Sequence, residues 1–396
     1  MNSRIFIFKN LIVYLILFIF FLINKYLLFF NIFLKFKYFI SYMGLQNEFK
    51  KIENFFNLCN NNKIKIIKKH KKIINPKISF ICTAYNRGKF ILRFLKSIQY
   101  QNFNNIEIII IDDGSNDNTF KNVEQYKQLD QRILNIKNKK NKGTFISRNL
   151  GVLYSKGEYI IFPDPDDIIS KNIINICYKY AEKYNCEMIR FNLYIKGEGI
   201  SFKIAKNLEK NKIYQPKLST YIFYGNNELQ VIDCYISNKF VKKNLIIKVL
   251  NSLNSFYINI YMTFMEDSLI NYMLYRLAES FLFIEKIGYF YIRNSQSITK
   301  NLEKISELRL NFIFYFLNFI YQNSKNIKYE KDMFNVFFTN LNKQFNIGQK
   351  LHFASFKLNF HYFYKIINIF IKNKFITDDN KNVLNNYKKI IESKIK

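Results

Sequence analysis

A nearly unbroken isoleucine run, Ile106–Ile111, limits the possible folds more strongly than any other part of the chain. A strand that is apolar at every position is covered on both faces, as in a parallel sheet that lies between layers of helices. Other strand-like runs begin at Ile78, Ile133 and Glu158, and helical patterns lie between them. This alternation predicts an α/β fold with a doubly wound, mixed but mostly parallel sheet flanked by helices.

A cluster of carboxylates, formed by Asp164, Asp166 and Asp167, follows the strand-like run Glu158–Phe162. Carboxylates this close repel one another, by roughly 1 kcal/mol per pair in water and by more in a partly buried site. Oxygen ligands with no nearby His or Cys suit Mg²⁺, Mn²⁺ or Ca²⁺. The cluster therefore indicates either a divalent metal site or a solvated Asp-Pro turn. Its position beyond the end of a strand favours the metal site, because ligands bind there in such sheets.

The N-terminal segment Leu11–Leu34 is apolar apart from the break at Asn24 and Lys25. A membrane span needs about 20 mostly apolar residues. No small-residue cleavage site follows the apolar run, so we expect residues 1–40 to be an uncleaved single-pass membrane anchor. The side of the membrane is left open: lysines after the anchor favour a cytosolic catalytic domain, but lysine is common throughout this chain.

The formal net charge of +32 suggests an anionic partner such as a nucleic acid or a membrane. However, the chain is rich in Lys, Asn, Ile and Phe and has no Trp, so lysine serves as its usual polar residue. The basic stretch Lys63–Lys77 lacks the arginines and aromatic residues of a nucleic-acid-binding surface. We interpret residues 41–77 as a basic stem and expect no nucleic-acid partner. The five cysteines have no zinc-site or disulfide spacing.

Six motifs follow one another between Ile78 and about Lys300: Ile78–Gly88, Glu107–Thr119, Asn141–Gly151, Gly157–Asp167, Glu266-Asp267 and Gly288–Thr299. Together they resemble glycosyltransferase family 2, a group of inverting, metal-dependent sugar transferases with the GT-A fold. The resemblance implies that residues 78–195 bind the nucleotide-sugar and that residues 196–300 form the acceptor side. Residues 301–396 are expected to be a helical C-terminal extension because their aromatic-rich patterns are helical.

The same resemblance implies a donor site for a UDP-sugar and a Mn²⁺ or Mg²⁺ ion. Asp166 would bind the metal, and Asp164 would lie beside it on the ribose side as a further metal ligand. Pro165 departs from the small residue that is common at this position, and it removes one backbone donor. Asp167 is expected to contact only the following helix. The remaining donor-site residues are Thr83, Tyr85 and Asn86 for the nucleoside, Asp113 or alternatively Asp112 for the uracil N3–H, and Arg148 and Arg293 for the diphosphate.

An inverting transfer also needs a base that takes a proton from the acceptor hydroxyl. The resemblance places this base in the acidic pair, with Asp267 as the base and Glu266 as the residue that orients the acceptor. The competing interpretation is a pair of acids that stabilises a helix N-terminus.

The sequence thus predicts a membrane-anchored inverting transferase that moves a sugar from a UDP-sugar to a hydroxyl of a glycan, lipid-phosphate or protein acceptor. One alternative is a metal-dependent nucleotidyltransferase or retaining transferase on a similar fold, which does not predict the downstream acidic pair. Another is a non-enzymatic basic protein that binds membrane or nucleic acid, which leaves the ordered acidic motifs unexplained.

Overall fold

The computed structural model describes residues 69–196, 213–214, 235–253 and 266–292, together with isolated residues at 54–55, 58–59, 385, 388–389 and 392. The chain divides into two compact units, Met1–Lys63 and Ile64–Lys396, and the sheet lies in the second. The predicted anchor at residues 1–40, Arg293 and most of the predicted C-terminal extension lie outside the described residues. In the described part, no helix is both long and apolar enough for a membrane span.

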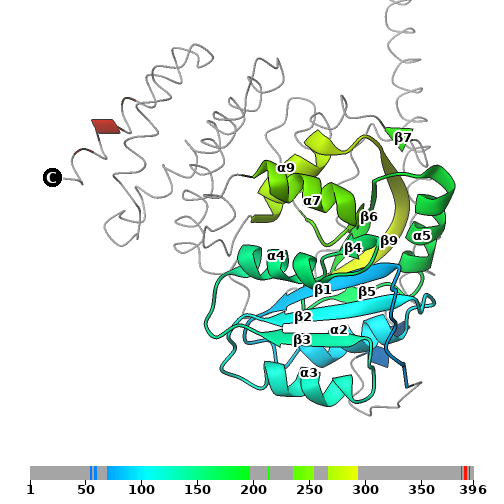
Figure 1. Cartoon of the computed structure of the whole chain (residues 1–396), viewed down its shortest axis with the longest axis vertical. Coiled ribbons are helices and arrows are strands. Elements are labelled where there is room, and N and C mark those ends of the chain that lie inside the picture. Colours follow the sequence, from blue (N-terminus) through cyan, green and yellow to red (C-terminus); the bar gives the residue numbers. More distant parts are fainter. Residues whose placement is uncertain are drawn as a thin grey trace, which may run out of the picture. The chain divides into compact units, whose positions relative to one another are not determined.

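The described strands form one nine-stranded sheet in the order β3-β2-β1-β4-β8-β6-β9-β5, with β7 paired to β9 (Figure 1). Neighbours among β1 to β4 are all parallel, and so are β6 and β9, whereas β8 runs antiparallel to β4 and β6. The sheet is therefore mixed and mostly parallel, as predicted. The strands are β1 (Ile78–Ala84), β2 (Ile106–Asp112), β3 (Ile133–Lys137), β4 (Tyr159–Ile161), β5 (Ile168–Ile169), β6 (Met188–Lys196), β7 (Ile213–Tyr214), β8 (Lys239–Lys242) and β9 (Phe281–Ile292).

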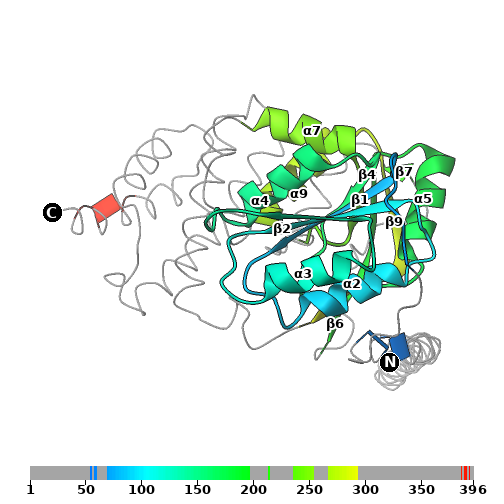
Figure 2. The ribbon, with the colours of Figure 1, turned by 60° about the horizontal axis from the view of Figure 1, so that its bottom comes forward.

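Helices cover both faces of the parallel half of the sheet (Figure 2). Phe80 and Cys82 of β1 belong to the core that includes residues of α2, α3 and α5. Ile81 points to the opposite face, where α4 lies so close that a Cβ on Gly151 would stand 2.2 Å from Ile81 Cγ2. The helices are α2 (Ile91–Gln99), α3 (Thr119–Lys127), α4 (Thr144–Tyr154), α5 (Ile173–Tyr184), α7 (Lys243–Ser252) and α9 (Glu266–Leu277).

The order of the first four strands positions the site. The chain runs outward from β1 through β2 to β3 and then crosses back to β4 on the other side of β1. Ligands bind at such a reversal, beyond the carboxyl ends of the strands. The segments found there are the Thr83–Gly88 turn after β1, Asp112 and Asp113 at the end of β2, and the Asp164–Asp167 loop after β4.

The strands predicted to begin at Ile78, Ile106, Ile133 and Glu158 all form within one residue of those positions, and helices lie between them in the sequence, as predicted. No strand or helix was predicted at Lys239–Lys242 or Lys243–Ser252, which form β8 and α7. Both are short, so their local pattern is weak, and pairing with β4 and β6 stabilises β8.

Candidate active site

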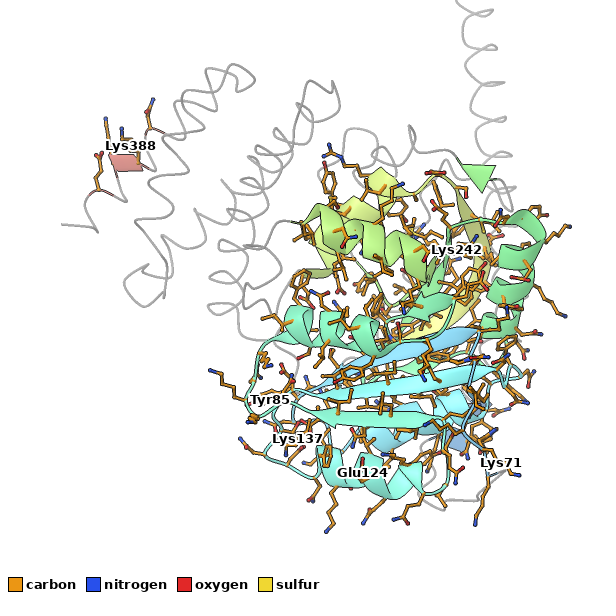
Figure 3. The ribbon with its side chains drawn as sticks, in the orientation of Figure 1. Lys71, Tyr85, Glu124, Lys137, Lys242 and Lys388 are labelled. Atoms are coloured by element: carbon orange, nitrogen blue, oxygen red, sulfur yellow. The ribbon has the colours of Figure 1, made fainter. Side chains whose placement is uncertain are left out.

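The turn after β1 is held in shape by the loop after β2. Asn86 has a positive φ of 52°, and its amide N–H donates to Ser115 Oγ at 2.9 Å. Its side-chain Oδ1 accepts from the amide of Asn116 at 3.0 Å. This arrangement leaves Tyr85 41% exposed, at the edge of the sheet where β1 and β2 end (Figure 3). The aromatic face is therefore available for stacking with a planar ligand.

The adjacent carboxylates Asp112 and Asp113 are both buried, but their surroundings differ. The Asp113 carboxylate accepts three hydrogen bonds, from Asn138 Nδ2 at 2.8 Å and from the amides of Lys142 and Gly143, each at 2.9 Å. Asp112 Oδ1 accepts from the Ser115 amide at 2.7 Å, whereas Asp112 Oδ2 has no hydrogen-bond partner. Asp113 therefore holds the loop that precedes α4, whereas Asp112 Oδ2 is buried without a hydrogen-bond partner.

The loop after β4 carries its carboxylates at different depths. Asp164 and Asp166 stay partly exposed, while Asp167 is buried. Arg87 Nε lies 3.6 Å from Asp166 Oδ2, and Arg93 donates to the backbone oxygen of Asp166. Two arginines from the first turn and from α2 thus hold Asp166, and the sequence motifs had not indicated either contact.

The acidic pair begins helix α9, and a buried arginine of α4 reaches it. Arg148 Nη1 donates to Asp267 Oδ1 at 2.7 Å and lies 3.5 Å from Glu266 Oε1. Its guanidinium carbon also lies 5.7 Å from the centre of the Phe162 ring at the end of β4. The Asp267 side chain is 24% exposed and that of Glu266 only 9%. Asp267 is thus the member of the pair that a bound molecule can reach more easily.

The acids at this edge raise one another's proton affinity. Burial, followed by the Asp267 and Asp166 carboxylates, raises the pKa of Asp164 to about 8. Burial and Asp267 raise the pKa of Glu266 to about 7, although Arg148 opposes this. Burial lowers the pKa of Arg148, but Asp267, Glu266 and Asp164 outweigh burial, so the net shift is upward and the guanidinium stays charged. The site therefore concentrates negative charge that the described cations only partly balance.

Residues 79–250 match the family model described as Glycosyl transferase family 2. This part of the chain belongs to glycosyl transferase family 2. It is 28% identical over 235 residues to the glycosyltransferase GlyG of Streptococcus pneumoniae, a match that covers 56% of this chain and 73% of GlyG. It is 31% identical over 168 residues to TarP of Staphylococcus aureus, a poly(ribitol-phosphate) beta-N-acetylglucosaminyltransferase, with 41% of this chain and 50% of TarP covered.

The fold of this family 2 glycosyltransferase resembles that of S. aureus TarS. The crystal structure of TarS residues 1–349 in complex with UDP-GlcNAc aligns with a TM-score of 0.52 and 19% identity, and covers 74% of this chain and 80% of the TarS chain. The GT-A-like fold is therefore confirmed. The family match favours a glycosyltransferase over the non-enzymatic basic protein and the nucleotidyltransferase.

Asp164 and Asp166 have the chemistry of a divalent metal site in this family 2 enzyme. Mg²⁺ and Mn²⁺ commonly use one or two carboxylates together with substrate phosphates and water. Within the described ranges, no group of three or more His, Cys, Asp or Glu side chains is arranged to hold a metal by itself. The two carboxylates thus fit a metal that a bound diphosphate would complete. Burial and the neighbouring carboxylates raise the pKa of Asp164, and a cation would oppose both effects.

The expectation that Asp167 contacts the following helix is wrong. Its Oδ2 accepts from Tyr289 Oη at 2.7 Å and its Oδ1 accepts from the amide of Ile292 at 2.7 Å, so it binds strand β9 instead. Helix α5 begins only at Ile173 and its N-cap, Asn172, makes no side-chain capping bond. Tyr289 was not singled out from the sequence, although it lies in the last of the six motifs.

Proposed function

We propose that this chain is an inverting transferase that moves a sugar from a UDP-sugar to an acceptor hydroxyl, with a divalent cation in the donor site. The observation that carries this proposal is the contact between Arg148 and Asp267, which brings a candidate base to the same edge of the sheet as Asp164 and Asp166. A metal-binding side and a proton-accepting side are the two parts that such a single displacement needs.

In the proposed reaction, the acceptor oxygen attacks the anomeric carbon while the bond from that carbon to the UDP oxygen breaks, and UDP leaves with the electron pair. Asp267 takes the proton of the acceptor hydroxyl. Its partial exposure and its 2.7 Å ion pair with Arg148 support this role, because the guanidinium orients the carboxylate. Glu266, which is more deeply buried, would support that geometry.

On the donor side, Tyr85 would stack on the uracil, with Thr83 and Asn86 near its edge or the ribose. Either Asp112 or Asp113 would accept from the uracil N3–H, and the buried Oδ2 of Asp112, which lacks a hydrogen-bond partner, supports Asp112. A cation bound by Asp166, with Asp164 beside it, would neutralise charge on the leaving diphosphate. Arg148 has five N–H donors, so a diphosphate contact is compatible with its bond to Asp267.

UDP-GlcNAc is the first donor to test. TarP is named as an N-acetylglucosaminyltransferase, and the TarS crystal contained UDP-GlcNAc. For the acceptor, the name of TarP adds a polyol-phosphate chain to the expected glycan, lipid-phosphate and protein hydroxyls. The N-terminal anchor at residues 1–40 remains part of the proposal and would place the reaction at a membrane.

Nucleotide binding to the full-length chain in detergent tests this proposal. UDP with Mn²⁺ should raise Tm, EDTA should abolish the shift, and CDP or ADP should have a smaller effect. A chain that responds to none of these nucleotides would contradict the proposal. A preference for ATP or CTP would favour nucleotidyl transfer.

A further inference from the structure

Tyr289 connects the loop that carries the proposed metal ligands to strand β9. The backbone N–H of Asp164 donates to Tyr289 Oη at 2.9 Å, and the same hydroxyl donates to Asp167 Oδ2 at 2.7 Å. The other carboxylate oxygen of Asp167 accepts from the Ile292 amide at 2.7 Å. One tyrosine and one aspartate thus join both ends of the Asp164–Asp167 loop to a single strand.

The strand pairing beside this loop keeps the connection in register. Immediately after the loop, β5 pairs antiparallel with β9, with Ile169 opposite Tyr289. Within the loop, the amide of Asp167 donates to the backbone oxygen of Asp164 at 3.3 Å. The loop is therefore closed on itself and held to β9 at its first residue, its last residue and the strand that follows.

Both members of this pair are buried: Asp167 and Tyr289 are each 1% exposed. A buried carboxylate and hydroxyl cost free energy unless they are hydrogen-bonded, and apolar side chains would fill the same space without that cost. Fully satisfied buried polar groups fix one geometry more tightly than apolar packing does. Here the geometry that they fix is that of the backbone between Asp164 and Asp166.

We propose that Tyr289 and Asp167 are positioning residues for the donor site: they hold the Asp164–Asp166 loop in the geometry that binds the metal and the diphosphate. Neither side chain touches the reacting atoms. The inference rests on the proposed function, because it assigns these two residues to the loop that binds the donor.

The decisive variant is Tyr289→Phe in the full-length chain, which removes only the hydroxyl. UDP affinity in the presence of Mn²⁺ should fall about tenfold, the value of one well-placed hydrogen bond to a charged group. KM for the UDP-sugar should rise by a similar factor, while KM for the acceptor should stay within about twofold. Asp167→Asn should give the same pattern, and the effects of the two changes should not add fully in the double variant, because they share the bond between Tyr289 Oη and Asp167 Oδ2.

Tyr126→Phe is the matched control. Its hydroxyl donates to Gln99 Oε1 at 2.7 Å between α3 and α2, outside the site, and its ring is 3% exposed. This variant should keep wild-type UDP affinity even where it lowers Tm. If the wild-type chain binds UDP and Tyr289→Phe binds it with the same affinity, the positioning role is overturned but the proposed function is not. A wild-type chain that binds no uridine nucleotide would overturn the proposed function and this inference with it. If both Tyr289→Phe and Asp167→Asn fail to fold, the pair serves folding and the positioning role is refuted.

Discussion

Arg148 Nη1 donates to Asp267 Oδ1 over 2.7 Å, which joins helix α4 to the start of α9 across 119 positions of the sequence. The two residues come from separate motifs, one after β3 and one at the start of α9. The contact ties the helix that carries the proposed diphosphate-binding arginine to the helix that carries the proposed base. Removing either partner should therefore affect more than one local interaction.

Asp267→Asn should lower the transfer rate by about 10²- to 10⁴-fold, the usual contribution of a general base. UDP affinity should change little, because the donor-side residues stay in place. The measurements are steady-state kcat and isothermal titration with UDP and Mn²⁺. Glu279→Gln is the control, since Glu279 lies between α9 and β9 in an exposed ion pair with Lys248. Equal rates for Asp267→Asn and the wild type would refute the assignment of the base.

Arg148→Ala should destabilise the folded state by about 3 kcal/mol, because it leaves the buried Glu266 carboxylate and its neighbour without their cation. Chemical denaturation followed by circular dichroism measures this change. Adding Glu266→Gln to Arg148→Ala should recover part of the loss. Lys248→Met removes a cation from a largely exposed pair and should cost about 0.5 kcal/mol or less. If Arg148→Ala lowers stability by as little as Lys248→Met, then Glu266 and Asp267 are stabilised by another partner, and the prediction is wrong.

The raised pKa values predict that the metal-free protein becomes less stable as pH rises. Glu266 and Asp164 bind protons more tightly when folded, with pKa values of about 7 and about 8. Their contribution to stability is fully present below their unfolded pKa values, near pH 4, and is lost as pH rises through 7 and 8. In EDTA, Tm should therefore fall between pH 5 and pH 8.5, and Asp164→Asn should flatten this profile. A profile that is equally steep in Asp164→Asn would contradict the origin of the effect.

Asp112 and Asp113 should respond differently to the same substitution. Asp113→Asn disturbs a carboxylate that accepts three hydrogen bonds. It should therefore lower the free energy of unfolding by about 2 kcal/mol, which a lower Tm would show. Asp112→Asn should leave Tm closer to that of the wild type. It should weaken UDP binding, because Asp112 Oδ2, which has no hydrogen-bond partner, is the acceptor proposed for the uracil N3–H. If instead only Asp113→Asn weakens UDP binding, and does so without lowering Tm, then Asp113 is the residue that accepts from the uracil N3–H.

Much of the fold could be predicted because the strands of its first half are apolar along their whole length. Ile106–Ile111 needed cover on both faces, and the structure provides it with α2 and α3 on one side and α4 on the other. The short elements β8 and α7 could not be predicted in the same way. Their positions depend on pairing with β4 and β6, which are distant in the sequence.

The candidate site residues could be named from the sequence, but their contacts could not be predicted. The motifs that hold Asp164 and Asp267 are about a hundred residues apart, and in the structure Arg148 contacts Asp267 and is influenced by the charge of Asp164. Which carboxylate is buried depends on tertiary contacts: Asp167 binds Tyr289 rather than the next helix. Likewise, a sequence does not reveal that Arg148 reaches Asp267, because that contact requires two helices to meet.

The most direct test of the central claim is release of UDP from UDP-sugars by the full-length chain with Mn²⁺, without an added acceptor. A slow release from one UDP-sugar, with UDP-GlcNAc tested first, is expected, and both EDTA and Asp166→Ala should abolish it while Glu279→Gln leaves it unchanged. Release that persists at the wild-type rate in EDTA and in Asp166→Ala would contradict the metal-dependent donor site. A chain that neither hydrolyses nor binds any UDP-sugar would contradict the proposed transfer itself.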